Sequence, residues 1–163
     1  SQDRADAKKY PAIDPLAYTT SVYDGFISWK DRRKILGTLE EANGIDQTIS
    51  TIGLKKVPVE KYVVFQKGQT IDFCVLQQDA FHDLDACTRP DRLNVLNDAI
   101  QKLIENPINF TANGMEDEEL KDLVKTKFDE LRQWWKDWNS TAQSEAQMAE
   151  LGRKIDQFIA QED

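Results

Sequence analysis

One short stretch of the chain gathers the side chains that could bind a metal ion or transfer protons. It holds His82, Asp83, Asp85 and Cys87, and His82 is the only histidine in the sequence. Imidazole, carboxylate and thiolate groups are the usual protein ligands of zinc, but this spacing matches no standard structural zinc site. We therefore predict no metal site and interpret the cluster as a polar loop between two helices. Asp83 and Asp85 are interpreted as a solvated acidic turn, not as a catalytic pair.

The sequence also lacks the common motifs of phosphate chemistry. It has no Gly-x-x-x-x-Gly-Lys-Ser/Thr loop to surround phosphate groups and no Gly-x-Gly-x-x-Gly turn. With a single histidine, any Ser-His-Asp or Cys-His arrangement would have to use His82. We therefore predict no catalytic residue within this chain.

Three tryptophans near the end of the chain could mark a ligand or partner surface. Trp135 and Trp138 continue a stripe of apolar residues at helical spacing that includes Leu131, and Trp134 lies beside that stripe. Aromatic residues at helical spacing usually pack in a core. We predict that Trp135 and Trp138 are buried and that Trp134 lies at the edge of the core. The acidic run 117–119 is interpreted as the start of a helix, where negative charge is favourable.

Apolar residues recur every three or four positions along most of the chain, which predicts an all-α fold. Ser28 and Asp31 have the spacing of a capping box, and Gly53 is a typical helix end. Further helices are predicted after Pro58, from Thr88 to Asn106, from about residue 116 to Asn139-Ser140-Thr141, and after that break; a short one is predicted at 14–24. The predicted core is Ile35, Leu39, Ile49, Val63, Phe73, Leu96, Ile100, Leu123, Phe128, Leu131 and Ile155.

Composition excludes some classes of partner. The net charge is −8, with 21 basic against 29 acidic residues. Binding to nucleic acid or to an anionic membrane surface needs an excess of Lys and Arg, so neither is predicted. No apolar run approaches the roughly 18 residues of a membrane-spanning helix. Two cysteines, Cys74 and Cys87, are predicted to be reduced thiols of a cytoplasmic protein. The polar start at Ser1, without Met, is interpreted as that of an excised fragment or a processed product.

Two motifs resemble the nucleotide-binding subunits of rotary ATPases. Residues 10–16 read Tyr-Pro-Ala-Ile-Asp-Pro-Leu, which is similar to the aromatic-proline loop that lies against adenine in these subunits. Residues 76–82 read Leu-Gln-Gln-Asp-Ala-Phe-His, which resembles the Leu-Gln-Gln-Asn-Ala-Phe-His pattern of the catalytic alpha chain of V-type and A-type enzymes. Residues 30–55 also resemble this alpha chain, and the recognisable similarity covers about residues 6–104.

The resemblance implies a division of the chain and a site. Residues 1–25 would be the end of the nucleotide-binding domain with a connecting loop and short helix, and residues 26–163 a C-terminal helical domain. Tyr10, Phe81 and Gln78 would line the adenine pocket for ATP or ADP, bound with Mg²⁺ in the parent subunit. The phosphate loop, the magnesium-binding Asp and the catalytic Glu would precede Tyr10. The chain alone is therefore expected to bind no cofactor and to be inactive.

The resemblance also implies partners and location. The parent subunit would contact B subunits, one of which supplies an arginine to the site, and the central rotor subunit. The complex would couple ATP hydrolysis or synthesis to proton or sodium translocation, on the cytoplasmic side of a membrane and without direct insertion. Ala86 and Thr88 depart from the family pattern around Cys87. The alternative is a stand-alone acidic helical interaction module with accidental motif matches, and a phosphate loop upstream would distinguish the two.

Overall fold

The computed structural model describes residues 27–76, 90–111, 113–141 and 144–162. Tyr10, Gln78 and Phe81, the cluster from His82 to Cys87, and the predicted helix at 14–24 lie outside these residues. The described part is all-α, as predicted from the apolar spacing. Its elements are α4 (Trp29–Ile52), the 3₁₀ turn η1 (Leu54–Lys56), α5 (Val59–Ile71), the π-helical turn η2 (Asp72–Leu76), α6 (Pro90–Glu105), α7 (Asp117–Thr141) and α8 (Glu145–Ala160).

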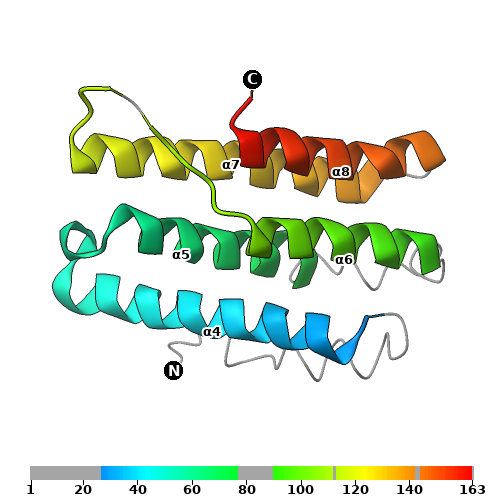
Figure 1. The fold of residues 1–163 in the computed structure, drawn as a ribbon, viewed down its shortest axis with the longest axis horizontal. Coiled ribbons are helices and arrows are strands. Elements are labelled where there is room, and N and C mark those ends of the chain that lie inside the picture. The colour runs from blue at the N-terminus through cyan, green and yellow to red at the C-terminus, as the bar shows by residue number, and fades with distance from the viewer. Residues whose placement is uncertain (1–26, 77–89, 112, 142–143, 163) are drawn as a thin grey trace.

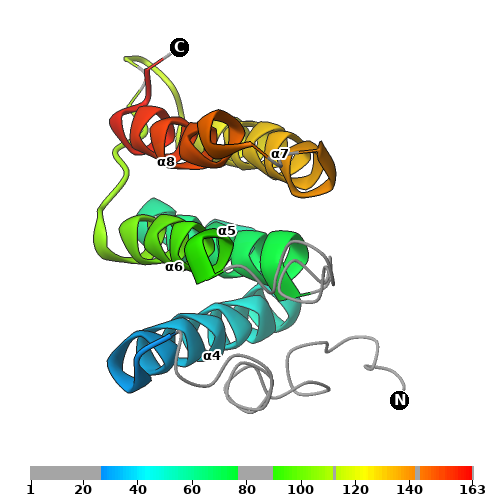
Figure 2. The same ribbon diagram turned by 90° about the vertical axis from the view of Figure 1, so that its right-hand side faces the viewer.

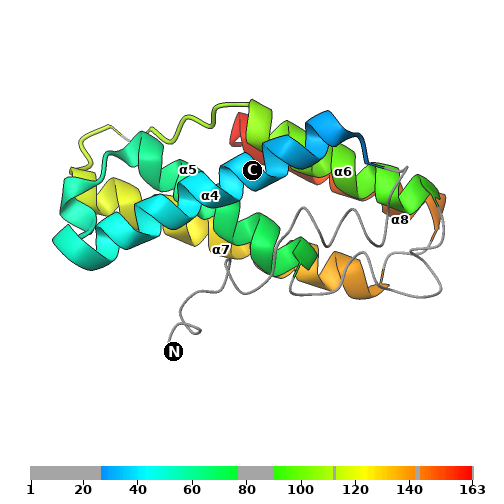
Figure 3. The ribbon, with the colours of Figure 1, turned by 90° about the horizontal axis from the view of Figure 1, so that it is seen from below.

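The helices are stacked in three layers (Figures 1 and 2). Helix α4 forms one outer layer, α5 and α6 the middle layer, and α7 with α8 the other outer layer. In the middle layer α5 packs against α4 and α7, and α6 packs against α4 and α8. Seen along the stack, α4 crosses both helices of the middle layer (Figure 3). The middle layer is therefore covered on two faces.

Helix starts and stops follow local chemistry. The Ser28 hydroxyl accepts a hydrogen bond from the Asp31 backbone N–H at 3.1 Å, which satisfies one of the free donors of the first turn. Helix α4 then ends at Gly53, whose φ of 98° favours glycine. Helix α7 does not break at 139–141 as predicted, because those residues complete its last turn. The cap of α8 is Ser144, which forms a full capping box with Gln147.

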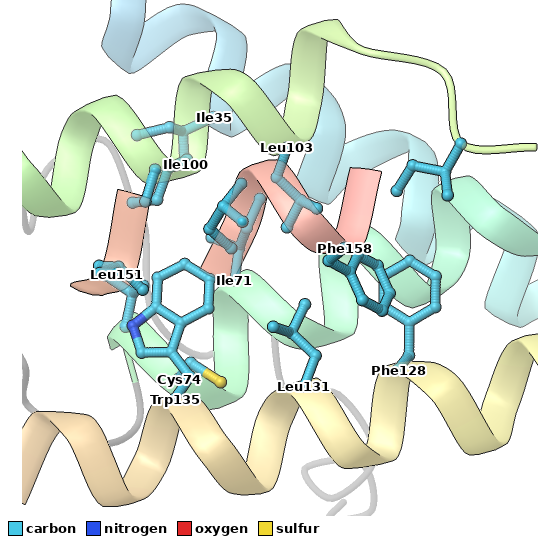
Figure 4. Packing of buried hydrophobic residues seen from close by; sticks show 14 of the residues in the cluster. Ile35, Ile71, Cys74, Ile100, Leu103, Phe128, Leu131, Trp135, Leu151 and Phe158 are labelled. Atoms are coloured by element: carbon cyan, nitrogen blue, oxygen red, sulfur yellow. The ribbon is translucent and has the colours of Figure 1, made fainter. Parts of the chain in front are cut away.

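The core contains side chains from each α-helix of the described residues, and most of the residues predicted to form it are buried. Phe128, Leu131 and Trp135 point from α7 toward the middle layer (Figure 4), and Trp138 is also buried while Trp134 is only partly covered.

Three predicted core positions differ in the structure. Ile49 and Phe73 are only partly buried. Leu123 is predicted as core, but Val124 occupies the fully buried position beside it. The two neighbours are ~100° apart around the helix, and the sequence allows either to continue the stripe.

The segment between α6 and α7 contributes to the core, although the sequence pattern predicts only a loop there. Phe110 lies 6.0 Å from Phe128 and 6.2 Å from Phe158, between ring centroids. Phe128 and Phe158 themselves meet edge to face at 4.8 Å (Figure 4), a favoured arrangement of aromatic rings. Ile108 is also buried. This connection therefore packs against α7 and α8 through its own apolar side chains.

Four buried cationic side chains donate hydrogen bonds to backbone carbonyls near the ends of elements. The pairs are Arg32 Nε with Ile27 O at 2.9 Å, Lys67 Nζ with Asn106 O at 2.8 Å, Arg92 Nη2 with Asn139 O at 3.1 Å, and Lys121 Nζ with Leu54 O at 2.9 Å. Helix ends leave carbonyls without intrahelical partners. Lys67 and Arg92 donate to carbonyls at such ends, whereas the Leu54 carbonyl reached by Lys121 also accepts from the Val57 N–H at 3.0 Å. For Lys67, burial lowers the pKa, and Glu41 partly opposes this effect.

None of the helices in the described part of the chain has both the length and the apolar character needed to span a bilayer.

The first prediction concerns the centre of the core. Leu96 is fully buried on α6. Leu96→Ala should lower the free energy of unfolding by about 2–5 kcal/mol, because it removes buried methyl groups and leaves a cavity. Chemical denaturation of the chain measures the change. Ile52→Ala, at a site 58% exposed at the end of α4, is the control and should cost less than about 0.5 kcal/mol. Equal effects of the two variants would contradict the assigned core.

The second prediction tests the contact between α4 and α5. A Cβ added at Gly68 would lie 2.3 Å from the Ala42 Cβ, so the helices approach too closely for a side chain there. Gly68→Ala should therefore destabilise the protein by about 1–3 kcal/mol through overpacking.

Gly37, which is exposed on α4 and has no atom within 4 Å of an added Cβ, provides the matched control. Gly37→Ala should stabilise the protein by about 0.5–1 kcal/mol, because alanine loses less backbone entropy in a helix. Melting temperatures that shift in the same direction for both variants would argue against the close approach.

The third prediction concerns Cys74, a free and fully buried thiol. Burial raises its pKa to about 12, with Arg132 opposing the shift. In a Cys87→Ser variant, which leaves Cys74 as the only thiol, alkylation by iodoacetamide at pH 8 should proceed only as fast as the protein unfolds. Rapid alkylation of the folded variant would show that the site is open.

The same pKa shift has a defined effect on stability. The unfolded thiol ionises near its ordinary pKa of about 8.5, whereas the folded thiol stays protonated up to about 12. The unfolded state therefore binds fewer protons in this range, and the contribution of Cys74 to stability falls as pH rises through it.

Candidate functional site

The described residues that border the second motif define the surroundings of the candidate site. The motif at 76–82 begins at the last residue of η2, and α6 begins at Pro90. Both elements are joined to the C-terminal half of α7 through specific hydrogen bonds. We refer to η2, the first turns of α6 and the C-terminal half of α7 as the frame that borders residues 77–89.

On the N-terminal side of the frame, the chain changes from α-helix to π-helix. Helix α5 ends at Ile71, and η2 continues it as a π-helical turn. Such turns are rare and often occur at functional sites. Cys74 lies in this turn, where its thiol donates to the Arg132 carbonyl at 3.8 Å and its own carbonyl accepts from Asn139 Nδ2 at 2.6 Å. The turn is thus fastened to α7 at two points.

On the C-terminal side, Arg92 fastens the first turns of α6. Its guanidinium donates to the Asn139 carbonyl at 3.1 Å and to Met148 Sδ at 3.8 Å, and lies 4.8 Å from the centre of the Trp138 ring. The indole of Trp138 in turn donates to the Gln147 carbonyl at 2.7 Å. A cation over an aromatic face in a dry site is a favourable contact. Arg92 therefore ties α6 to the end of α7 and the start of α8.

A separate groove of about 600 Å³ lies between α5 and α7. Its lining includes Tyr62, Phe73, Asp129 and Arg132. Arg132 donates to Gln66 Oε1 at 2.9 Å, and also to Thr70 and Asp129, so its charge serves contacts within the protein.

The ionisable groups of this groove reflect the same contacts. Burial opposes ionisation of Asp129, but the hydrogen bonds from Lys125 and Arg132 outweigh it and hold the pKa of Asp129 below its ordinary value. Burial raises the pKa of Tyr62, with the Gln66 hydrogen bond opposing. The groove is thus organised around an internal ion-pair network.

The site residues predicted from the sequence are not placed by the structure. Tyr10, Gln78 and Phe81 lie outside the described residues, as does the cluster at 82–87. Within the described residues, no group of three or more His, Cys, Asp or Glu side chains could hold a metal ion.

Sequence reasoning does not identify Asn139 or Arg92. The sequence pattern places Asn139 in a helix break. Arg92 lies near the start of the helix predicted from Thr88, and nothing in its spacing indicates burial. The only sequence clue is the position of Arg92 next to Leu93 at the start of a helix.

Comparison with known proteins gives one consistent result. The chain is 26% identical over 98% of its length to a V-type ATP synthase alpha chain of Borreliella afzelii, and 26% identical over 95% to the one of Borrelia garinii subsp. bavariensis. The alpha chain of Borreliella burgdorferi matches at 29% identity over 68% of the chain. The chain spans only about a quarter of the length of the first two relatives, 26% and 27%. No family model matches, and no solved structure matches.

These matches extend the resemblance that the motifs indicated. A match over 98% of the chain cannot be confined to residues 6–104, so it includes helices whose sequence pattern alone was not specific. The resemblance predicted from the two motifs is confirmed: the chain is similar, over nearly its whole length, to V-type ATP synthase alpha chains.

Proposed function

We propose that this chain is the C-terminal helical part of the catalytic alpha chain of a V-type rotary ATP synthase. The observation that carries the proposal is the similarity to alpha chains over 98% of the chain, together with the two motifs at 10–16 and 76–82. The all-α architecture fits a helical domain that follows a nucleotide-binding domain. In this proposal residues 1–25 connect the two domains and residues 26–163 form the helical domain.

The role that we propose for the chain is to complete the adenine pocket. The rings of Tyr10 and Phe81 offer flat faces on which a purine base stacks. The amide of Gln78 carries both a donor and an acceptor, which suits the edge of adenine. The parent subunit would bind ATP or ADP with Mg²⁺, and its phosphate ligands would come from residues outside this sequence. Positioning and charge stabilisation of the phosphoryl group would then be the work of those residues.

The helical domain would also transmit force. We propose that it contacts the central rotor subunit, while neighbouring B subunits complete the hexameric head at the membrane periphery. A bundle whose middle layer is packed on both faces is suited to this role, because dense cores transmit displacement with little compression. The alternative, a stand-alone acidic interaction module, does not account for similarity over nearly the whole chain.

The fourth prediction tests the adenine pocket. In the assembled ATPase, Tyr10→Ala and Phe81→Ala should each raise the KM for ATP. Loss of a stacking face worth about 1–3 kcal/mol corresponds to a rise of about 5- to 150-fold. Steady-state kinetics measure the change. Tyr10→Phe keeps the ring and should retain a KM close to that of the unsubstituted enzyme. If both alanine variants leave KM unchanged while lowering thermal stability, these residues are structural and the pocket assignment is wrong.

A further inference from the structure

The groove between α5 and α7 is a surface to which the proposed function gives no role. Helix α5 packs against α7 in one half of the stack, and α6 packs against α8 in the other (Figure 2). Every residue that lines the groove belongs to α5, η2 or α7. None of the other elements in the described ranges therefore contributes to its walls.

The groove has the length of a short helix. Its lining runs from Tyr62 to Phe73 on one wall and from Lys125 to Gln133 on the other, with neighbouring lining residues one, three or four positions apart. The longer wall extends for about 16 Å at the rise of a helix, which is three turns. The space between two helices accepts the side-chain ridge of a third. The shape therefore suits a helical occupant of about three turns.

The wall formed by α5 and η2 offers aromatic surface. The rings of Tyr62 and Phe65 stack with their centroids 5.9 Å apart. Phe65 and Phe73 are only partly buried by the bundle itself. Such rings, beside a groove open to solvent, can bury further apolar area against the side chains of another protein. An occupant with one apolar face fits this wall.

The charged side chains of the groove leave an excess of positive charge. Lys125 Nζ lies 2.7 Å from Asp129 Oδ2, and Arg132 Nη2 lies 2.5 Å from Asp129 Oδ1. One carboxylate balances only one of these two cations. Burial raises the pKa of Tyr62, and the charges of Lys125 and Arg132 oppose that shift, so their field reaches the wall formed by α5.

Two other grooves lack this excess, and the chain as a whole is acidic, with a net charge of −8. The groove of about 320 Å³ between α6 and α8 is lined by Asp98 and Glu105 against Lys102. The groove between α7 and α8 is lined by two lysines and two glutamates. Lys136 and Asp137 contact the lining between α5 and α7, and their charges cancel. This groove is therefore a positively charged site on an acidic protein.

We propose that the groove between α5 and α7 binds an acidic amphipathic helix of about three turns from a partner protein. The apolar face of that helix would lie against the rings of Tyr62, Phe65 and Phe73. Its carboxylates would lie near Lys125 and Arg132, and this complementarity would select the partner. The inference goes beyond the proposed function and does not depend on the adenine pocket.

Selection of peptides tests the chemistry of the occupant. Random peptides of about 16 residues, enough for three turns with flanking residues, are displayed on phage and selected on the 163-residue chain. They are then depleted on Gln133→Trp, a change at an exposed lining position whose new ring would fill the groove. Depletion removes basic peptides that bind elsewhere on this acidic protein. The remaining peptides should be negatively charged, with apolar residues three and four positions apart.

Charge variants of the α5 wall test where these peptides bind. Gln69 lines the groove. Gln69→Glu keeps the size of the side chain and should raise the Kd at least about threefold, whereas Gln69→Lys should lower it by about the same factor. Gln47→Glu, at an exposed site of α4 outside the groove, is the matched control. It should change the Kd less than about 1.5-fold, measured by fluorescence anisotropy at about 50 mM salt.

The outcomes are distinct. Enriched peptides that are basic or uncharged would overturn the inference, and so would a selection without groove-dependent peptides. Equal Kd values for Gln69→Glu and Gln47→Glu would show that acidic peptides bind elsewhere. Each variant should melt within about 3 °C of the unsubstituted chain, which separates lost binding from lost folding. None of these results bears on the KM of Tyr10→Ala or Phe81→Ala, so the two proposals fail independently.

Discussion

The structure depends on the enclosure of its middle layer between two outer layers. Helices α5 and α6 are packed against other helices on both faces, so polar groups buried between the layers need hydrogen-bond partners within the protein. Buried unpaired carbonyls are costly. Lys67 and Arg92 donate to carbonyls at the C-terminal ends of α6 and α7, and Lys121 adds a second donor to the Leu54 carbonyl, which also accepts from the Val57 N–H. In this acidic protein, several buried Lys and Arg side chains therefore serve as hydrogen-bond donors to backbone carbonyls.

Close contacts also hold each outer layer to the rest of the bundle. The connection from α6 to α7 passes along the molecule and buries Phe110 against Phe128 and Phe158. On the opposite outer layer, Gly68 allows α5 to approach Ala42 of α4 more closely than any side chain would permit. Both contacts are dense and leave little freedom for one layer to slide over another. Such rigidity would suit the proposed role of this domain in transmitting force.

The candidate site was accessible to sequence reasoning only through resemblance. Tyr10, Gln78 and Phe81 stand out because their motifs match a family, and the similarity to V-type ATP synthase alpha chains supports the family but does not place the residues. The hydrogen bonds of the described residues that border 77–89 could not be predicted. Asn139 has low helix propensity and lies in a predicted break, yet it is helical and bonded to Cys74. Tertiary hydrogen bonding overrode the local preference.

The sequence by itself determined the all-α class, the caps at Ser28 and Gly53, and most of the core, because the 3.6-residue period and capping chemistry are local properties. Only the tertiary structure decided that Val124 instead of Leu123 completes the core stripe. It also decided that Phe110, in the connection between α6 and α7, packs into the core. It also decided which buried cation caps which carbonyl. These choices depend on which helix lies opposite, and the spacing of residues along one helix carries no information about its neighbour.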